Sequence, residues 1–247
     1  MRLTVLGSCG AWPEAGQACG GYLVEHEGFR LVVDLGYATF PRLLEFAAAA
    51  AIDAVVISHG HPDHCADLNP LLRARALPGD PVAALPVHAL PGALDAVLAL
   101  DRPGMLADAI DLQVIRPGEP LGLGPFRVTT RMLPHWLPNA GVRIEADGSV
   151  LAYTGDTGSV PEIAELARDA GLLLAEATYL DQVPEDSAGH LSSAREAGRW
   201  AAAAGVGRLL LTHLWPGSDQ AAAAARARES YAGDVRVAGA GMAIEVS

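Results

Sequence analysis

One short run constrains the fold of this chain more than any other: Ser58-His59-Gly60-His61-Pro62-Asp63-His64. It directly follows residues 54–57, an Ala-Val-Val-Ile stretch typical of a buried β-strand. Imidazole nitrogens and carboxylates held on a rigid backbone bind metal ions. His59 and His61 can turn toward one ion, whereas Asp63 and His64 follow a proline that redirects the chain toward a second. A polar surface loop is the alternative, and this spacing at a strand end disfavours it.

Length, composition and net charge favour some classes of function over others. Its 247 residues, of which 51% are hydrophobic, suffice for a sizeable core. No linker-like composition divides them, so we expect one domain over residues 1–247. The formal charge of −12 disfavours a broad nucleic-acid surface, which needs clustered basic side chains. DNA is therefore not an expected partner, and RNA is a weaker expectation than a small anion held by metal ions.

The cysteines and the apolar runs indicate the compartment. Cys9, Cys19 and Cys65 are an odd, sparse set, which predicts no disulfide framework and a reducing environment. The first ten residues are too short and too polar for a signal peptide. No apolar run approaches the roughly 20 residues that a membrane-spanning helix needs. We expect a cytoplasmic protein without a membrane partner.

Periodicity and turn signals predict alternating strands and helices. We expect strands at 2–6, 21–25, 29–34, 54–58, 87–89, 112–115, 121–123, 126–133, 142–146, 150–154, 172–177, 208–212 and 235–237. We expect helices at 39–51, 66–76, 92–100, 160–170, 192–204 and 219–231, with Ser192 as the N-cap of the fifth, and a loop at 78–86. This order favours an α/β protein with two sheets packed face to face and helices outside.

The H-x-H-x-D-H run resembles that of the metallo-β-lactamase-fold hydrolases. The resemblance implies an αβ/βα four-layer sandwich with two divalent metal ions at one edge, between the sheets. It implies one site of His59, His61, His135 and Asp156, and a second of Asp63, His64, His213 and the same Asp156. Asp156 and His213 each follow an apolar run, and a carboxylate can bridge two ions. Such a donor set suits Zn²⁺, with Mn²⁺ or Fe²⁺ as alternatives. Asp34 is placed like a family aspartate near the metals, with a turn or capping role as the alternative.

Two further elements resemble the ribonuclease Z-like branch of this family. Residues 172–179 read Leu-Leu-Leu-Ala-Glu-Ala-Thr-Tyr, and residues 189–193 read Gly-His-Leu-Ser-Ser. In that branch the histidine, here His190, is the candidate proton donor to the leaving oxygen, and the glutamate, here Glu176, orients it. The alternative is a strand-end charge and a helix N-terminal residue. No basic arm for gripping transfer RNA is visible, and total length and motif order are closer to small bacterial atypical class II cyclic-nucleotide phosphodiesterases.

The expected activity is therefore hydrolysis of a small phosphodiester, with a cyclic nucleotide of the cAMP type as the leading candidate. The resemblance implies attack by a metal-bridging hydroxide, catalytic roles for Asp63, His190 and Glu176, and a homodimer. Rival functions are a transfer-RNA 3′ endoribonuclease, a lactone or thioester hydrolase, and a non-enzymatic RNA- or metal-binding protein. Residues 135–139 depart from the glyoxalase-type run, which disfavours the thioesterase. The loop at 9–20, with Trp12, lines the pocket or stacks on a base, or is purely structural.

Overall fold

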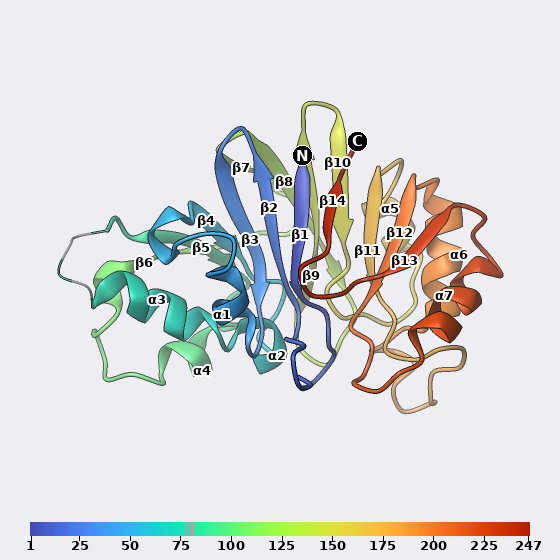
Figure 1. The fold of residues 1–247 in the computed structure, drawn as a ribbon, viewed down its shortest axis with the longest axis horizontal. Coiled ribbons are helices and arrows are strands. Elements are labelled where there is room, and N and C mark those ends of the chain that lie inside the picture. The colour runs from blue at the N-terminus through green and yellow to red at the C-terminus, as the bar shows by residue number, and fades with distance from the viewer. Residues whose placement is uncertain (78, 80–81) are drawn as a thin grey trace.

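Two β-sheets face each other in the computed structural model, which describes residues 1–77, 79 and 82–247 (Figure 1). Within these residues the first sheet has seven strands in the order β14-β1-β2-β3-β4-β5-β6, and the second has seven in the order β13-β12-β11-β10-β9-β8-β7. The first contains β1 (Arg2–Gly7), β2 (Gly21–His26), β3 (Phe29–Leu35), β4 (Ala54–Val56), β5 (Leu85–Ala89), β6 (Ile110–Val114) and β14 (Ala243–Glu245). The second contains β7 (Leu121–Leu123), β8 (Phe126–Leu133), β9 (Asn139–Ala146), β10 (Ser149–Tyr153), β11 (Leu172–Glu176), β12 (Arg208–Thr212) and β13 (Asp234–Val237).

Helices cover the outer face of each sheet, so the predicted four-layer αβ/βα sandwich is confirmed (Figure 1). The first sheet is covered by α1 (Thr39–Leu43), α2 (Pro62–Cys65), α3 (Leu68–Ala76) and α4 (Asp95–Leu98), with short 3₁₀ turns at Ala49–Ala51 and Ala107–Ala109. The second sheet is covered by α5 (Glu162–Leu166), α6 (Ala194–Ala204) and α7 (Gln220–Arg228). In the part of the chain that the structure describes, no helix is long and apolar enough to cross a membrane.

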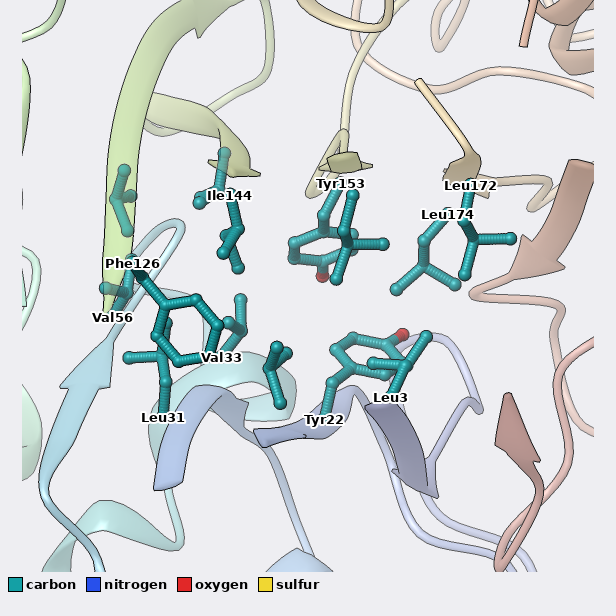
Figure 2. Packing of buried hydrophobic residues seen from close by; sticks show 14 of the residues in the cluster. Leu3, Tyr22, Leu31, Val33, Val56, Phe126, Ile144, Tyr153, Leu172 and Leu174 are labelled. Atoms are coloured by element: carbon teal, nitrogen blue, oxygen red, sulfur yellow. The ribbon is translucent and has the colours of Figure 1, made fainter. Parts of the chain in front are cut away.

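The central core lies between the two sheets and joins them. Tyr22 from β2 and Tyr153 from β10 meet there, with ring centroids 5.1 Å apart (Figure 2). Phe126 packs nearby against residues of β3. Burying apolar side chains from both inner faces gives each sheet the partner that it needs. Because this core spans both halves of the chain, residues from distant segments are fixed at the edge where the sheets meet.

The strand directions explain why the functional segments gather at one edge. β3, β4 and β5 are parallel to one another, and so are β10, β11 and β12. β1 and β8 are each related to a strand of these sets by two antiparallel steps. All these strands therefore end at the same edge, at the bottom of the view (Figure 1). The loops that leave this edge carry the chemistry.

Several predicted elements are shorter or displaced. The helix expected at 39–51 is reduced to α1 and a separate 3₁₀ turn, although five alanines favour a helix there. The helices expected at 92–100 and 160–170 shrink to α4 and α5. Intrinsic propensity is a weak prior that tertiary packing overrides. Residues 78, 80 and 81 of the predicted loop lie outside the described residues.

The N-cap of α6 also differs from the prediction. Ser193, not Ser192, caps the helix, because its hydroxyl accepts from the Glu196 amide while the Glu196 carboxylate accepts from the Ser193 amide. This reciprocal pair is a capping box. Ser192 instead donates its hydroxyl to the carbonyl of Thr157 at 2.7 Å. Ser192 therefore binds the loop after β10 instead of capping the helix.

Candidate metal centre

The structure brings all seven predicted metal ligands together where the parallel strands end. His59 and His61 follow β4, and Asp63 and His64 lie in α2. The other three ligands, His135, Asp156 and His213, follow β8, β10 and β12 respectively. They form two groups whose candidate ligand atoms lie within 4.8 Å of one another: His59, His61, His135 and Asp156 in group one, and Asp63, His64, Asp156 and His213 in group two. The residue sets match those predicted for the two sites.

Group one is a cage of three imidazoles and one carboxylate. Nδ1 of His61 lies 3.1 Å from Nε2 of His59 and 3.0 Å from Nε2 of His135. Oδ2 of Asp156 lies 3.7 Å from Nε2 of His59 and 3.8 Å from Nε2 of His135. Four such atoms converging on one point have the donor types and number of a tetrahedral site.

Group two shares the Asp156 carboxylate. Oδ2 of Asp156 lies 3.1 Å from Nε2 of His213, and Oδ1 lies 3.3 Å from Nε2 of His64. The second carboxylate, Asp63, is 3.2 Å from Nε2 of His213 and 3.5 Å from Nε2 of His64. Oδ2 of Asp156 thus faces His59 and His135 of group one as well as His213 of group two, so this carboxylate is placed to be shared by both groups.

Glycine at the end of β10 allows Asp156 to reach this position. Gly155 has φ +59°, and a Cβ there would lie 2.2 Å from Oδ1 of Asn139. A residue with a side chain would be strained by the backbone conformation and would also collide with Asn139. Glycine at position 155 therefore permits the turn that sets the direction in which Asp156 points.

Each of four histidines places one ring nitrogen in the cluster and hydrogen-bonds through the other. The outer partners of Nδ1 are Ser58 Oγ for His59 (3.1 Å), Asp34 Oδ2 for His64 (2.8 Å), the His190 carbonyl for His135 (2.7 Å) and Thr178 Oγ1 for His213 (2.9 Å). Outer partners of this kind fix the ring orientation of metal-binding histidines. The predicted role of Asp34 beside the ligands is the one that its contacts support.

Burial and mutual charge prepare these groups for a cation. Burial, with His64 nearby, lowers the pKa of His59 well below its ordinary value, and burial lowers the pKa of His61 and His135 as well. Burial by itself would raise the pKa of Asp156, but His213 and His64 hold it well below its usual range. Neutral imidazoles and ionised carboxylates are the forms that bind a metal.

Two orphaned polar atoms show that the residues fit a metal ion. Within the described chain, Nε2 of His64 and Oδ1 of Asp156 are buried and lie 3.3 Å apart, and neither has a hydrogen-bond partner of good geometry. A buried polar atom without a partner costs about 1–3 kcal/mol, so native proteins rarely leave one unsatisfied. Both atoms point into the cluster, where a divalent ion would satisfy them. The His and Asp groups are thus suited to binding metal ions.

Glu176 is not placed as predicted. Oε1 accepts from the Thr157 amide (2.7 Å), and Oε2 accepts from the Thr178 hydroxyl (2.7 Å). Among the described residues, no hydrogen bond joins Glu176 to His190, so the expected orienting contact is absent. Burial and the nearby Asp156 carboxylate raise the pKa of Glu176 to about 7. Through Thr178 this carboxylate supports His213, and through Thr157 it holds the residue next to Asp156.

His190 lies at the rim of the centre and is held by an aromatic ring instead. Its imidazole stacks on Trp136, with centroids 4.9 Å apart and an interplanar angle of 29°. Its Nδ1 is buried and has no hydrogen-bond partner in the described chain. The neighbours Ser187 and Leu191 line the same cavity as His61 and His135. His190 therefore lies next to residues that line the cavity and belongs to neither candidate ligand group.

The loop after β1, whose role the sequence left open, packs directly on the ligands. The Ala11 amide donates to Oδ2 of Asp63 at 2.8 Å. A Cβ on Gly10 would lie 2.8 Å from Nδ1 of His213, so only glycine lets the loop approach this ring. A cavity of about 420 Å³ opens over the ligands and is lined in addition by Trp136, Tyr179 and Trp215. The sequence analysis assigned none of these three aromatic residues to the cavity, because a single aromatic in or after a motif carries no spacing signal.

Comparisons with known proteins show which family this chain resembles. The profile described as "Beta-lactamase superfamily domain" matches residues 29–214. The "Probable metallo-hydrolase YhfI" of Bacillus subtilis is 34% identical over 87% of this chain and 87% of its own length. The crystal structure of YhfI matches with a TM-score of 0.90 and 31% identity over 99% of each chain. A ribonuclease Z of Kineococcus radiotolerans is 28% identical over 92% of this chain and 88% of its own length.

We predict that Thr178→Val weakens metal binding by group two. The substitution removes the hydroxyl that links Glu176 to His213 while nearly preserving the side-chain volume. Loss of such an outer partner typically lowers metal affinity roughly 10–100-fold. Zinc titration against a chromophoric chelator measures the change. Thr130→Val is the matched control, because the Thr130 hydroxyl is buried and has no hydrogen-bond partner in the described chain. Equal affinities in the two variants would contradict this role for Thr178.

Proposed function

Since the chain belongs to the β-lactamase superfamily and is a metallo-hydrolase of that fold, we propose that it hydrolyses a small phosphodiester with two metal ions. A cyclic nucleotide is the leading substrate. The observation that carries the proposal is the pair of ligand groups that share Asp156 beneath one cavity, with His190 at its rim. Paired sites of this kind serve phosphoryl chemistry because both the attacking and the leaving oxygen need stabilisation.

The seven residues of the two groups would hold the ions, and their mixed imidazole and carboxylate donors favour Zn²⁺ over Mn²⁺ or Fe²⁺. When bound, such ions lower the pKa of water to near 7 and neutralise charge on a phosphoryl group. Asp156 belongs to both groups and would help to hold both ions. His64 and His213 keep their orientation through Asp34 and Thr178.

Asp63 and His190 are the groups that would manage protons. The Asp63 carboxylate lines the cavity and is fixed by the Ala11 amide, so it can orient the attacking water and accept its proton. His190 stands on the other side, held by its stack on Trp136, and would protonate the departing alkoxide oxygen. Glu176 acts at a distance in this scheme, as a positioning residue for His213 and for the segment next to Asp156.

The size of the cavity and the charges around it favour a small substrate over a folded RNA. About 420 Å³ lies within the range of small-molecule sites. Among the described residues that line it, none is an arginine, although counter-ion release from clustered cations drives polyanion binding. The relative named ribonuclease Z supports transfer-RNA 3′ cleavage as the second candidate. Lactone or thioester hydrolysis is the third, and it has no use for His190.

The substrate proposal predicts a ranking of kcat/KM. We expect a 3′,5′- or 2′,3′-cyclic nucleotide to exceed a precursor transfer RNA, a lactone and a thioester, because the cavity admits one small diester. Steady-state kinetics of the zinc-loaded protein on this set measures the ranking. A higher kcat/KM for precursor transfer RNA than for every cyclic nucleotide would assign the second candidate function. Preference for the lactone or thioester would refute phosphodiester chemistry.

The proton-donor role predicts a leaving-group effect in His190→Ala. The turnover of an alkyl phosphodiester should fall roughly 10²–10⁴-fold, the usual contribution of a general acid. The loss should shrink for a p-nitrophenyl ester, whose leaving group departs without a proton. Metal content should stay unchanged, since His190 is not in either ligand group. His26→Ala is a matched control, because His26 pairs with Asp147 away from the cavity. An equal loss on both esters would contradict the acid role.

A further inference from the structure

Exposed tryptophans gather at the metal centre. Aromatic residues make up only 5% of the chain, and four of them are tryptophans. Trp12, Trp136 and Trp215 are 50%, 51% and 37% exposed. The fourth, Trp200, packs against the outer core of the second sheet and donates its indole N–H to Ser159. Large exposed apolar side chains that gather at one place indicate a binding surface rather than chance.

Three of the aromatic side chains at this opening form one continuous surface, which we call the aromatic wall: Trp12, Tyr179 and Trp215. The Trp215 ring lies 6.1 Å from Trp12 and 5.2 Å from Tyr179, measured between centroids. The wall is assembled from the loops after β1, β11 and β12, so three distant segments contribute to it.

The backbone under the wall is well anchored. The residue before Trp12, Ala11, has φ +62° and is tied to the Asp63 carboxylate. Tyr179 is fixed on both sides, since its amide donates to the Ser192 carbonyl and its carbonyl accepts from the Ala194 amide. Trp215 comes two residues after the ligand His213. The rings are therefore held in register with the metal ligands, and a preformed surface of this kind loses little entropy on binding.

The wall stands beside group two, and the pair formed by Trp136 and His190 stands beside group one. Tyr179 and Trp215 line the same cavity as Asp63 and His213, while Trp136 contacts His135, with ring centroids 5.1 Å apart. A phosphoryl group over Asp156 would have the proton donor on one side and the wall on the other. The substituent on the second side meets the aromatic rings of the wall.

We propose that the aromatic wall is a nucleobase subsite, so that the base of a nucleotide stacks on Trp215 while the tilted rings of Tyr179 and Trp12 flank it. This inference rests on the proposed phosphodiesterase function, and it narrows the substrate class to nucleotides. Stacking on aromatic rings tolerates every base, because each has a π-face. The subsite therefore favours base-bearing over base-free phosphates without distinguishing purines strictly from pyrimidines.

Binding without turnover tests the subsite separately from the hydrolysis. Calorimetry on the zinc-loaded protein gives the Kd of adenosine 5′-monophosphate and of ribose 5-phosphate, which differ by the base. We expect the nucleotide to bind at least about tenfold more tightly. Loss of one base–aromatic stack weakens binding roughly 5- to 150-fold. Trp215→Ala should therefore reduce the preference for the nucleotide by such a factor, or abolish it. Trp215→Phe should restore most of it, and Trp200→Phe should leave it unchanged.

The outcomes separate the two claims. Equal affinity for the two ligands in the wild type, or a preference that survives Trp215→Ala, overturns the subsite and leaves the wall as a surface for another partner. A base preference that depends on Trp215 supports the subsite even if no phosphodiester is hydrolysed, in which case the proposed function fails alone. Far-ultraviolet circular dichroism and zinc content establish that each variant is folded.

Discussion

The buried carboxylate of Asp34 is the contact on which the metal centre depends. It accepts from the Ser58 amide at 2.7 Å, the Ser58 hydroxyl at 2.7 Å and the Tyr153 hydroxyl at 2.8 Å, and it pairs with Nδ1 of His64 at 2.8 Å. Ser58 follows β4 of the first sheet, and Tyr153 ends β10 of the second sheet. One fully buried carboxylate therefore ties both sheets to a candidate ligand, and its burial is tolerated because hydrogen-bond donors surround it.

The centre itself is a set of groups that a cation would stabilise. Burial would lower the pKa of His64, but Asp156 and Asp63 hold it well above its ordinary value. A metal ion at this ring therefore competes with a proton for the same nitrogen. The strands hold the candidate ligands rigidly where they end, and the side chains provide the charge. The fold and the metal chemistry therefore depend on the same edge of the two sheets.

The sequence was most informative where spacing and strand ends coincide. The clustering of the seven candidate ligands and most strands could be predicted, because a short apolar run followed by His or Asp fixes both position and direction. Glu176 could not be assigned correctly, since its partners Thr157 and Thr178 depend on how β10 pairs with β11. β14 was missed because three residues at a sheet edge carry little periodicity. The place of Trp215 in the aromatic wall could not be predicted, because its neighbours Tyr179 and Trp12 come from other loops.

The central claim is that Asp156 joins two metal sites, and metal stoichiometry tests it most directly. Elemental analysis after zinc reconstitution and desalting should find two ions per chain in the wild type, one for each ligand group. Asp156→Ala should lose both ions, because each group then lacks its shared carboxylate. Asp108→Ala, which removes an exposed carboxylate elsewhere, should retain both. Fewer than one ion in the wild type, or full occupancy in Asp156→Ala, would contradict the account.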